Sequence, residues 1–299
     1  MLMANLFPKV TRLIVHSAII ATCGIGLSAC SSSMDDYNPF AAPKYKQKLV
    51  EDKPANTLYD EGLALLGKQD YATAAKRFDE LQQTYPSSDI ARKALLMHGF
   101  ANYKNGSYDD AVSSMVRYLR VDSRSKDAAY AQYIIAMSYY NQIPDITRDQ
   151  TQAIKAVSAM EQLLQNYPKS EYVNDIQSKL RIAKDQLAGK EMEVGRFYLG
   201  KRNYTAAINR FRDVVAKYQT TRHIEEALMR LTEAYMALGI TKEAQTAAAV
   251  LGHNFPDSKW YKDAYSLLQS GGLEPREDTG SWISRSFRSG ARKIGFGTN

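Results

Sequence analysis

Residues able to carry out redox or metal chemistry are few in this 299-residue chain, and their spacing argues against both. The two cysteines are Cys23 and Cys30, and the four histidines are scattered, with no pair at the spacing of metal ligands. The chain has no G-x-S-x-G, H-E-x-x-H or phosphate-loop motif. We therefore expect a protein that is not an enzyme and holds no metal or other cofactor.

Cys30 is the one thiol whose surroundings suggest a modification. Lys9 and Arg12 precede an apolar run over residues 13–27 that is too short and too interrupted to span a membrane. The run ends in Leu-Ser-Ala-Cys at residues 27–30. This sequence resembles the bacterial lipobox, in which the cysteine is acylated and becomes the first residue of the mature chain.

The lipobox predicts where the mature protein resides. We expect residues 1–29 to be a lipoprotein signal peptide and residues 30–52 to be a lipidated, flexible tether. Ser31 follows the cysteine, in place of the Asp typical of inner-membrane retention, which favours an outer-membrane anchor facing the periplasm. Acyl chains on one residue satisfy the requirement for stable anchoring. The alternative is an ordinary signal peptide with a chance cysteine.

The rest of the chain is organised by a repeated pair of amphipathic helices. Residues 58–67 and 71–85 have apolar residues at helical spacing, with a short polar break between them and Pro86 after them. Such a pair folds back on itself, and it needs copies to bury both apolar faces. Copies that share this pattern of small and aromatic residues in partial phase start at Ala55, Arg92, Ala129, Ala188 and Glu225.

These units resemble the tetratricopeptide repeat, which has a period of about 34 residues. The third unit fits only if the residues of 141–150 form an inserted loop, and residues 172–190 suggest a long helix before the fourth unit. The resemblance implies an all-α fold, a right-handed α-solenoid of about five helical hairpins. We divide it into front repeats 1–3 over 53–170, and a long connecting helix with rear repeats 4–5 over 171–270.

Residues 271–299 differ from the repeats. Two glycines end the preceding helix pattern, and apolar and basic residues then alternate from Trp282 to Phe296. We expect a basic, partly disordered C-terminal tail; the alternative is a segment that orders on a partner or a membrane surface. The net charge of +7 with 24% charged residues is mild, and no dense basic cluster supports nucleic-acid binding.

The repeat family places the first helix of each hairpin on a concave face. Carried onto this chain, its inward positions imply a front groove of aromatic side chains with lysines beside them, suited to a peptide that ends in an aromatic residue and a carboxylate. The alternative is that these aromatics pack between repeats. The groove residues are Tyr59, Lys93, Phe100, Tyr103, Lys104, Tyr130, Tyr133 and Tyr140.

The lipobox, the tether, the five repeats with an interrupted third unit and the segment 201–211 together resemble the BamD family of outer-membrane β-barrel assembly lipoproteins. The resemblance covers roughly residues 25–262. It implies that the front repeats bind unfolded outer-membrane β-barrel proteins and that the rear repeats bind the barrel insertase BamA. Arg210 is our candidate for the insertase contact, because its planar guanidinium suits a carboxylate; the alternative is a solvent-exposed arginine.

Two other functions remain open from the sequence. One is a lipoprotein scaffold or adaptor for cell-envelope enzymes such as those of peptidoglycan. The other is an enzyme of lipid or glycan metabolism built on a helical array.

Overall fold

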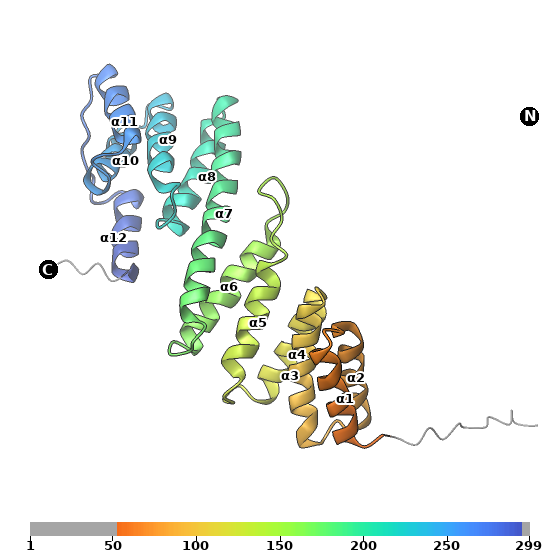
Figure 1. The fold of residues 1–299 in the computed structure, drawn as a ribbon. Helices are drawn as coiled ribbons and strands as arrows, with labels where there is room; N and C mark the ends of the chain where they lie inside the picture. Colours follow the sequence, from red (N-terminus) through yellow and green to blue (C-terminus); the bar gives the residue numbers. More distant parts are fainter. Residues whose placement is uncertain (1–52, 295–299) are drawn as a thin grey trace, which may run out of the picture. The chain divides into compact units, whose positions relative to one another are not determined.

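Helical hairpins follow one another along the chain in the computed structural model, which describes residues 53–294 and the side chains of residues 53–289 (Figure 1). Cys30, the predicted signal peptide and tether, and residues 295–299 lie outside the described residues. The described residues form helices and loops without a β-strand. The helices are α1 (Ala55–Gly67), α2 (Tyr71–Thr84), α3 (Asp89–Lys104), α4 (Tyr108–Val121), α5 (Ala128–Tyr140), α6 (Thr151–Asn166), α7 (Val173–Gly200), α8 (Tyr204–Lys217), α9 (Ile224–Ala237), α10 (Thr241–Asn254), α11 (Lys259–Ser270) and α12 (Trp282–Ile294).

The first ten helices form five hairpins, which confirms the all-α, tetratricopeptide-like fold. Four hairpins turn in the same way, because the residue at one fixed position between the two helices has a positive φ. Glycine fills that position in two turns, as Gly106 and Gly239, while Gln69 and Arg202 adopt the left-handed conformation in the other two. The predicted phase of these four units is therefore present in the backbone.

A missing side chain lets the two helices of a hairpin approach closely. A Cβ atom added to Gly62 would lie 2.5 Å from the ring of Phe78, and one added to Gly195 would lie 2.4 Å from the ring of Phe211. Both phenylalanines are fully buried. The small and aromatic residues that define the repeat in the sequence are thus each other's packing partners.

The third hairpin carries the predicted insertion, and the inserted loop packs against α7. Gln186 donates to the carbonyl of Pro144 at 3.2 Å, and Lys190 donates to the carbonyl of Thr147 at 3.1 Å. A Cβ atom added to Gly189 of α7 would lie 2.8 Å from Ile146 Cδ1, so this glycine leaves room for the Ile146 side chain. Helix α7 is a single helix of 28 residues, in agreement with the long helix expected from the sequence.

Helix α7 also joins two hydrophobic cores. Its Ile176 is buried with side chains of α3 to α6, whereas its Ala188 and Met192 are buried with side chains of α8 to α12. A third, smaller core lies between α1, α2 and α3. First helices of successive hairpins also touch, since α1 contacts α3, α3 contacts α5 and α5 contacts α7. These contacts place the odd-numbered helices of the front repeats on one common face.

The C-terminal segment differs from the expected basic, partly disordered tail, at least over residues 271–289. Helix α12 packs on α8 and α10. Ile283 is fully buried, and the indole nitrogen of Trp282 donates to the hydroxyl of Tyr235 at 3.1 Å. The physical reason is that the apolar residues of this segment fall on one side of a helix and meet an apolar surface on the rear repeats.

Candidate functional site

Three tyrosines from two elements form the centre of the predicted front groove. Tyr133 of α5 stacks on Tyr172, which immediately precedes α7, with ring centroids 4.6 Å apart and an angle of 27° between the planes. Tyr130, one turn earlier on α5, lies with its ring centroid 5.8 Å from that of Tyr172. All three side chains are half-buried, so each offers part of its ring to solvent.

A carboxylate and an ammonium group sit beside this stack. The hydroxyl of Tyr133 donates to Asp175 Oδ2 at 3.0 Å, and Lys179 Nζ contacts Asp175 Oδ1 at 2.6 Å. The hydrogen bond from Lys179 is the main reason that the pKa of Asp175 lies below its ordinary value. The same ammonium lies 6.0 Å from the ring centroid of Tyr140, at the end of α5.

Helix α3 supplies the neighbouring wall. Tyr103 accepts a hydrogen bond from Asn141 Nδ2 at 3.2 Å, which brings the end of α3 beside the end of α5. Lys104 Nζ lies 5.8 Å from the centroid of the half-buried Phe100 ring. The aromatic residues of α3, those of α5 other than Tyr139, and Tyr172 therefore lie on one surface. We call it the tyrosine surface; it comprises Phe100, Tyr103, Tyr130, Tyr133, Tyr140 and Tyr172.

Burial alters the acidity of the tyrosine surface. Desolvation is the main cause that raises the pKa of Tyr130 to about 12, with smaller contributions from Tyr172 and Tyr103. Desolvation also raises the pKa of Tyr133, and its hydrogen bond to Asp175 adds to the effect. These phenols stay neutral at physiological pH, so they can donate hydrogen bonds and contact apolar groups but cannot act as bases.

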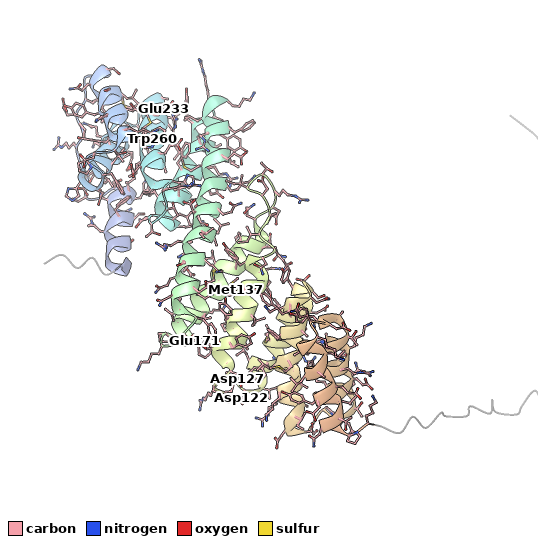
Figure 2. All side chains as sticks on the ribbon, viewed as in Figure 1. Asp122, Asp127, Met137, Glu171, Glu233 and Trp260 are labelled. Atoms are coloured by element: carbon pink, nitrogen blue, oxygen red, sulfur yellow. The ribbon has the colours of Figure 1, made fainter. Side chains whose placement is uncertain are left out.

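The two ends of the tyrosine surface differ in charge. Next to Tyr130 and Tyr172, a hollow of about 310 Å³ is lined by Asp127 and Glu171, both labelled in Figure 2, together with Lys126. At the other end, the lysine ammonium groups of Lys104 and Lys179 lie over aromatic rings. A bound anion is therefore better accommodated at the Lys104 end.

Two predicted groove residues lie apart from the others. Tyr59 of α1 packs on Phe78, with ring centroids 5.8 Å apart, and belongs to the core of the first repeats. Lys93 is exposed near the start of α3, at the opposite end of that helix from Lys104. The structure thus brings together Phe100, Tyr103, Lys104, Tyr130, Tyr133 and Tyr140 from the predicted set.

The sequence analysis did not include Tyr172, Asp175 or Lys179 in the groove. These three residues follow one another at helical spacing, so they fall on one face of the α7 start. That spacing was a usable signal. It was overlooked because the repeat pattern assigns the inward positions of the fourth unit to the later part of the same long helix.

Arg210, the predicted partner contact, lies on α8 and is 43% exposed. Its Nη1 atom lies 3.2 Å from Glu191 Oε2 on α7, so part of the guanidinium already binds a carboxylate of this chain. A shallow hollow of about 240 Å³ beside it is lined by Tyr198, Asn209 and Asp213. The remaining guanidinium donors are available to a second acceptor.

Across residues 53–294, no group of three or more histidine, cysteine, aspartate or glutamate side chains is arranged to hold a metal ion. None of the helices described for the same range is both long enough and apolar enough to cross a membrane.

Comparison with known proteins adds an independent line of evidence. A family model described as "YfiO: Outer membrane lipoprotein" matches residues 51–251. Proteins named "Outer membrane protein assembly factor BamD" are 40% identical in Caulobacter vibrioides, over 76% of this chain and 74% of the relative, and 38% identical in Rickettsia prowazekii, over 88% and 98%. The Neisseria meningitidis serogroup A protein of that name is 28% identical over 83% of this chain and 94% of its own length.

Solved structures that resemble the chain are less similar. The TPR2AB domain of yeast Sti1, in its pHSP90 complex, has a TM-score of 0.35 and is 13% identical. The match covers 81% of this chain and 92% of that one. The MamA protein has a TM-score of 0.32 and 16% identity, covering 73% and 93%. The extent of the family match and the identity to the BamD proteins together show that this chain belongs to the BamD (YfiO) family of outer membrane lipoproteins.

Proposed function

We propose that this chain is a non-enzymatic subunit of the machinery that assembles outer membrane proteins, and that its tyrosine surface binds the unfolded β-barrel substrates. The observation that carries the proposal is the tyrosine surface itself: half-buried rings from α3, α5 and the start of α7 lie together with lysines at one end. Membership of the family supports the assembly role. The BamD name of the relatives gives no binding residues, so those assigned here rest on the geometry.

The distribution of charge gives the bound peptide a direction. A substrate segment that ends in an aromatic residue brings one ring and one carboxylate. We expect the ring to contact Tyr133 and Tyr140, and the carboxylate to lie at the Lys104 end, away from Asp127 and Glu171. Burying one aromatic side chain contributes about 1.5–3 kcal/mol, whereas an exposed ion pair contributes at most about 1 kcal/mol. The aromatic contacts should therefore dominate the affinity.

Fluorescence anisotropy with a labelled C-terminal peptide of a barrel protein tests this proposal. Changing Phe100 and Tyr103 together to alanine should weaken binding more than changing Lys93 and Lys104 together to alanine. Removing the peptide's terminal aromatic residue should weaken binding about as much as the first pair of changes. A larger effect of the lysine pair would mean that binding is electrostatic, and the proposal for the tyrosine surface would then fail.

The single lysine variants test the direction of the peptide. Lys93 and Lys104 are both exposed and stand near opposite ends of α3, so each serves as the matched control for the other. Lys104→Ala should weaken binding of the peptide with a free C-terminal carboxylate by up to about fivefold. It should not affect binding of the same peptide with an amidated C-terminus. Lys93→Ala should change neither. Equal effects of the two substitutions would contradict the assigned direction.

The lipid anchor at Cys30 belongs to the same proposal, although the residue lies outside the described part of the chain. Cys30→Ser should give a protein that is no longer retained in the outer membrane, and inhibition of lipoprotein signal peptidase should cause the unprocessed precursor to accumulate. Normal retention of the variant would remove the lipoprotein assignment.

The rear repeats, through Arg210, are proposed to contact the barrel insertase BamA. A pull-down from detergent-solubilised envelopes distinguishes this role from the alternative of an adaptor for cell-envelope enzymes. Recovery of the insertase with the chain supports the assembly role. Recovery of peptidoglycan enzymes without the insertase would favour the adaptor.

A further inference from the structure

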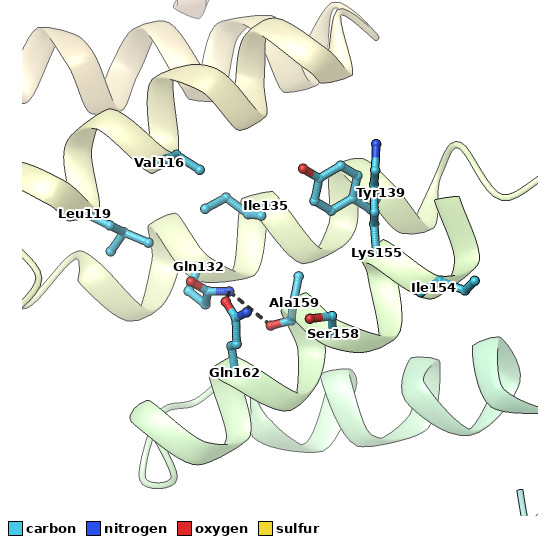
Figure 3. A pocket seen from close by; sticks show the side chains of 10 residues that line it. All are labelled: Val116, Leu119, Gln132, Ile135, Tyr139, Ile154, Lys155, Ser158, Ala159 and Gln162. Carbon is cyan, nitrogen blue, oxygen red and sulfur yellow. Dashed lines mark hydrogen bonds between the residues drawn. The ribbon is translucent and has the colours of Figure 1, made fainter. Parts of the chain in front are cut away.

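An open apolar groove lies on the front repeats, away from the tyrosine surface. It has a volume of about 530 Å³ and is formed by α4, α5 and α6 (Figure 3). Val116 on α4 and Ile154 on α6 are 40% and 59% exposed, and both belong to the apolar lining of the groove. Lys155 is the only charged side chain among those that line it, and its ammonium lies 5.6 Å from the ring centroid of Tyr139.

On the rear repeats, the corresponding place is filled by helix α12. This helix contacts α8 and α10, and its Trp282 donates to the hydroxyl of Tyr235 on α9. Ser281 donates to Glu243 Oε2 on α10 at 2.6 Å, and the guanidinium carbon of Arg212 on α8 lies 5.0 Å from the ring of Trp282. Ile283 is fully buried at the centre of this contact.

The front groove and the surface that α12 covers on the rear repeats are formed by equivalent positions of the repeat. In the phase that aligns the hairpins, Tyr139 of the third repeat occupies the same position as Tyr235 of the fifth. The other residues that line the groove correspond in the same way, once the insertion in the third hairpin is taken into account. Val116 aligns with Arg212, Leu119 with Val215, Lys155 with Glu243 and Ser158 with Thr246.

The differences between the two places define what the front groove would accept. Val116 stands where the rear site has Arg212, whose guanidinium lies on Trp282, so the wall of the front groove is more apolar. Lys155 replaces Glu243, so the charge that faces the start of a docked helix is reversed. The residue that meets Glu243 in the rear site is the neutral Ser281, so α12 of a second copy would bring no carboxylate to Lys155.

We propose that the groove formed by α4, α5 and α6 binds an amphipathic helix of a partner protein, with an aromatic residue that packs on Tyr139 and an acidic residue near its start that pairs with Lys155. The partner helix would lie on the second and third repeats in the way that α12 lies on the fourth and fifth. The site is separate from the tyrosine surface and from Arg210, and it does not depend on the function proposed above.

The test uses a probe made from this chain. It is a fluorescein-labelled peptide with the sequence of residues 278–294 carrying Ser281→Asp, which retains a good helix N-cap and adds the carboxylate. The receptor is the full chain purified in detergent, in which α12 already occupies the rear site. We expect saturable binding, and we expect the peptide with the unaltered Ser281 to bind about threefold to fivefold more weakly.

Two receptor variants locate the binding site. Ile154→Glu should weaken binding of the probe by at least about tenfold, because a charge would enter the apolar wall. Its matched control is Ile182→Glu, since Ile182 on α7 is 57% exposed against 59% for Ile154, and that variant should bind normally. Lys155→Glu should reverse the preference between the two peptides. Both isoleucines are exposed, so these variants should retain the helix content of the unaltered chain.

The outcomes that overturn the proposal are distinct. Absence of saturable binding to the unaltered chain would do so, as would equal weakening by Ile154→Glu and Ile182→Glu. Tighter binding of the unaltered peptide, together with concentration-dependent self-association in light scattering, would assign the groove to a second copy of this chain and exclude an acidic partner helix.

Discussion

The hydroxyl of Tyr133 donates a hydrogen bond of 3.0 Å to the carboxylate of Asp175, and this contact links the third repeat to the start of the long helix α7. The ring of the same tyrosine stacks on Tyr172, the residue that immediately precedes α7. Tyr133 therefore has two separable roles: its ring belongs to the tyrosine surface, and its hydroxyl fixes the position of that surface relative to α7.

Tyr133→Phe removes the hydroxyl and keeps the ring. We expect the free energy of unfolding at pH 7 to fall by about 1 kcal/mol, because a hydrogen bond to a charged acceptor is lost in a partly exposed place. Peptide binding should change little if the ring is what contacts the substrate. Urea unfolding followed by circular dichroism measures the first quantity, and anisotropy measures the second.

The same variant should change the response to alkaline pH. Burial and the hydrogen bond raise the pKa of Tyr133 above its unfolded value of about 10. The contribution of the neutral Tyr133 hydroxyl to the free energy of unfolding is therefore fully present below pH ~10. It is lost as the pH rises toward the raised pKa of the folded state. Above pH ~10, the free energy of unfolding should fall less steeply with pH in Tyr133→Phe than in the unaltered chain. A double-mutant cycle with Asp175→Asn is the control: additive effects would contradict a direct bond between the two side chains.

Gly195, in the first helix of the fourth repeat, should not tolerate replacement by alanine. In Gly195→Ala the new Cβ would meet the buried ring of Phe211 at 2.4 Å, and overpacking of this kind costs about 1–3 kcal/mol. Gly200→Ala on the same helix is the control, because its added Cβ would meet no atom within 4 Å beyond its own turn of helix. Thermal unfolding should show a lower midpoint for the first variant and an unchanged or slightly higher one for the second. Equal midpoints would contradict the packing argument.

The docked C-terminal helix should contribute to the stability of the rear repeats. Ile283→Ala truncates a fully buried side chain, and such changes cost about 2–5 kcal/mol unless a local segment detaches first. We expect faster hydrogen exchange in residues 278–289 and in the facing parts of α8 and α10. Phe197→Ala, at a residue 61% exposed, is the control and should change neither stability nor exchange. Unchanged exchange in Ile283→Ala would mean that α12 does not stay docked.

The parts of the fold that the sequence predicts are those whose contacting residues lie close together in the chain. The small and aromatic residues of each hairpin, such as Gly195 and Phe211, meet within one repeat, so their spacing alone predicts the contact. Docking of α12 could not be predicted in this way. Its partner residues Tyr235 and Glu243 lie in the fifth repeat, and they become a binding surface only after α8 to α10 have packed together.

For the candidate site, repeat geometry predicted which aromatic residues of α3 and α5 come together, but not their contacts with the start of α7. Phe100, Tyr103, Tyr130 and Tyr133 come from equivalent helices, so repeat geometry was enough to gather them. Tyr59 comes from the equivalent helix α1, but its ring packs on Phe78 within the first hairpin, a contact that the repeat positions do not predict. Tyr172 was missed because it lies before the part of α7 that follows the repeat pattern.

Arg210 binds Glu191 at 3.2 Å, yet 43% of its side chain is exposed. If its guanidinium also binds a carboxylate of the barrel insertase, Arg210→Glu should reduce co-purification of the insertase and leave the helix content unchanged. Arg210→Lys should give an intermediate loss, since lysine keeps the charge but not the planar pair of donors.

Glu191→Gln provides the decisive control for this prediction, because it weakens the internal ion pair and leaves Arg210 in place. For a partner contact, this variant should retain the insertase or bind it more tightly, since the guanidinium is freed for the partner. For a purely internal role, it should instead mimic Arg210→Glu. The internal pair contributes at most about 1 kcal/mol to stability, as expected of an exposed ion pair, so neither variant should unfold the rear repeats. Retention of the insertase by Arg210→Glu would remove Arg210 from the interface.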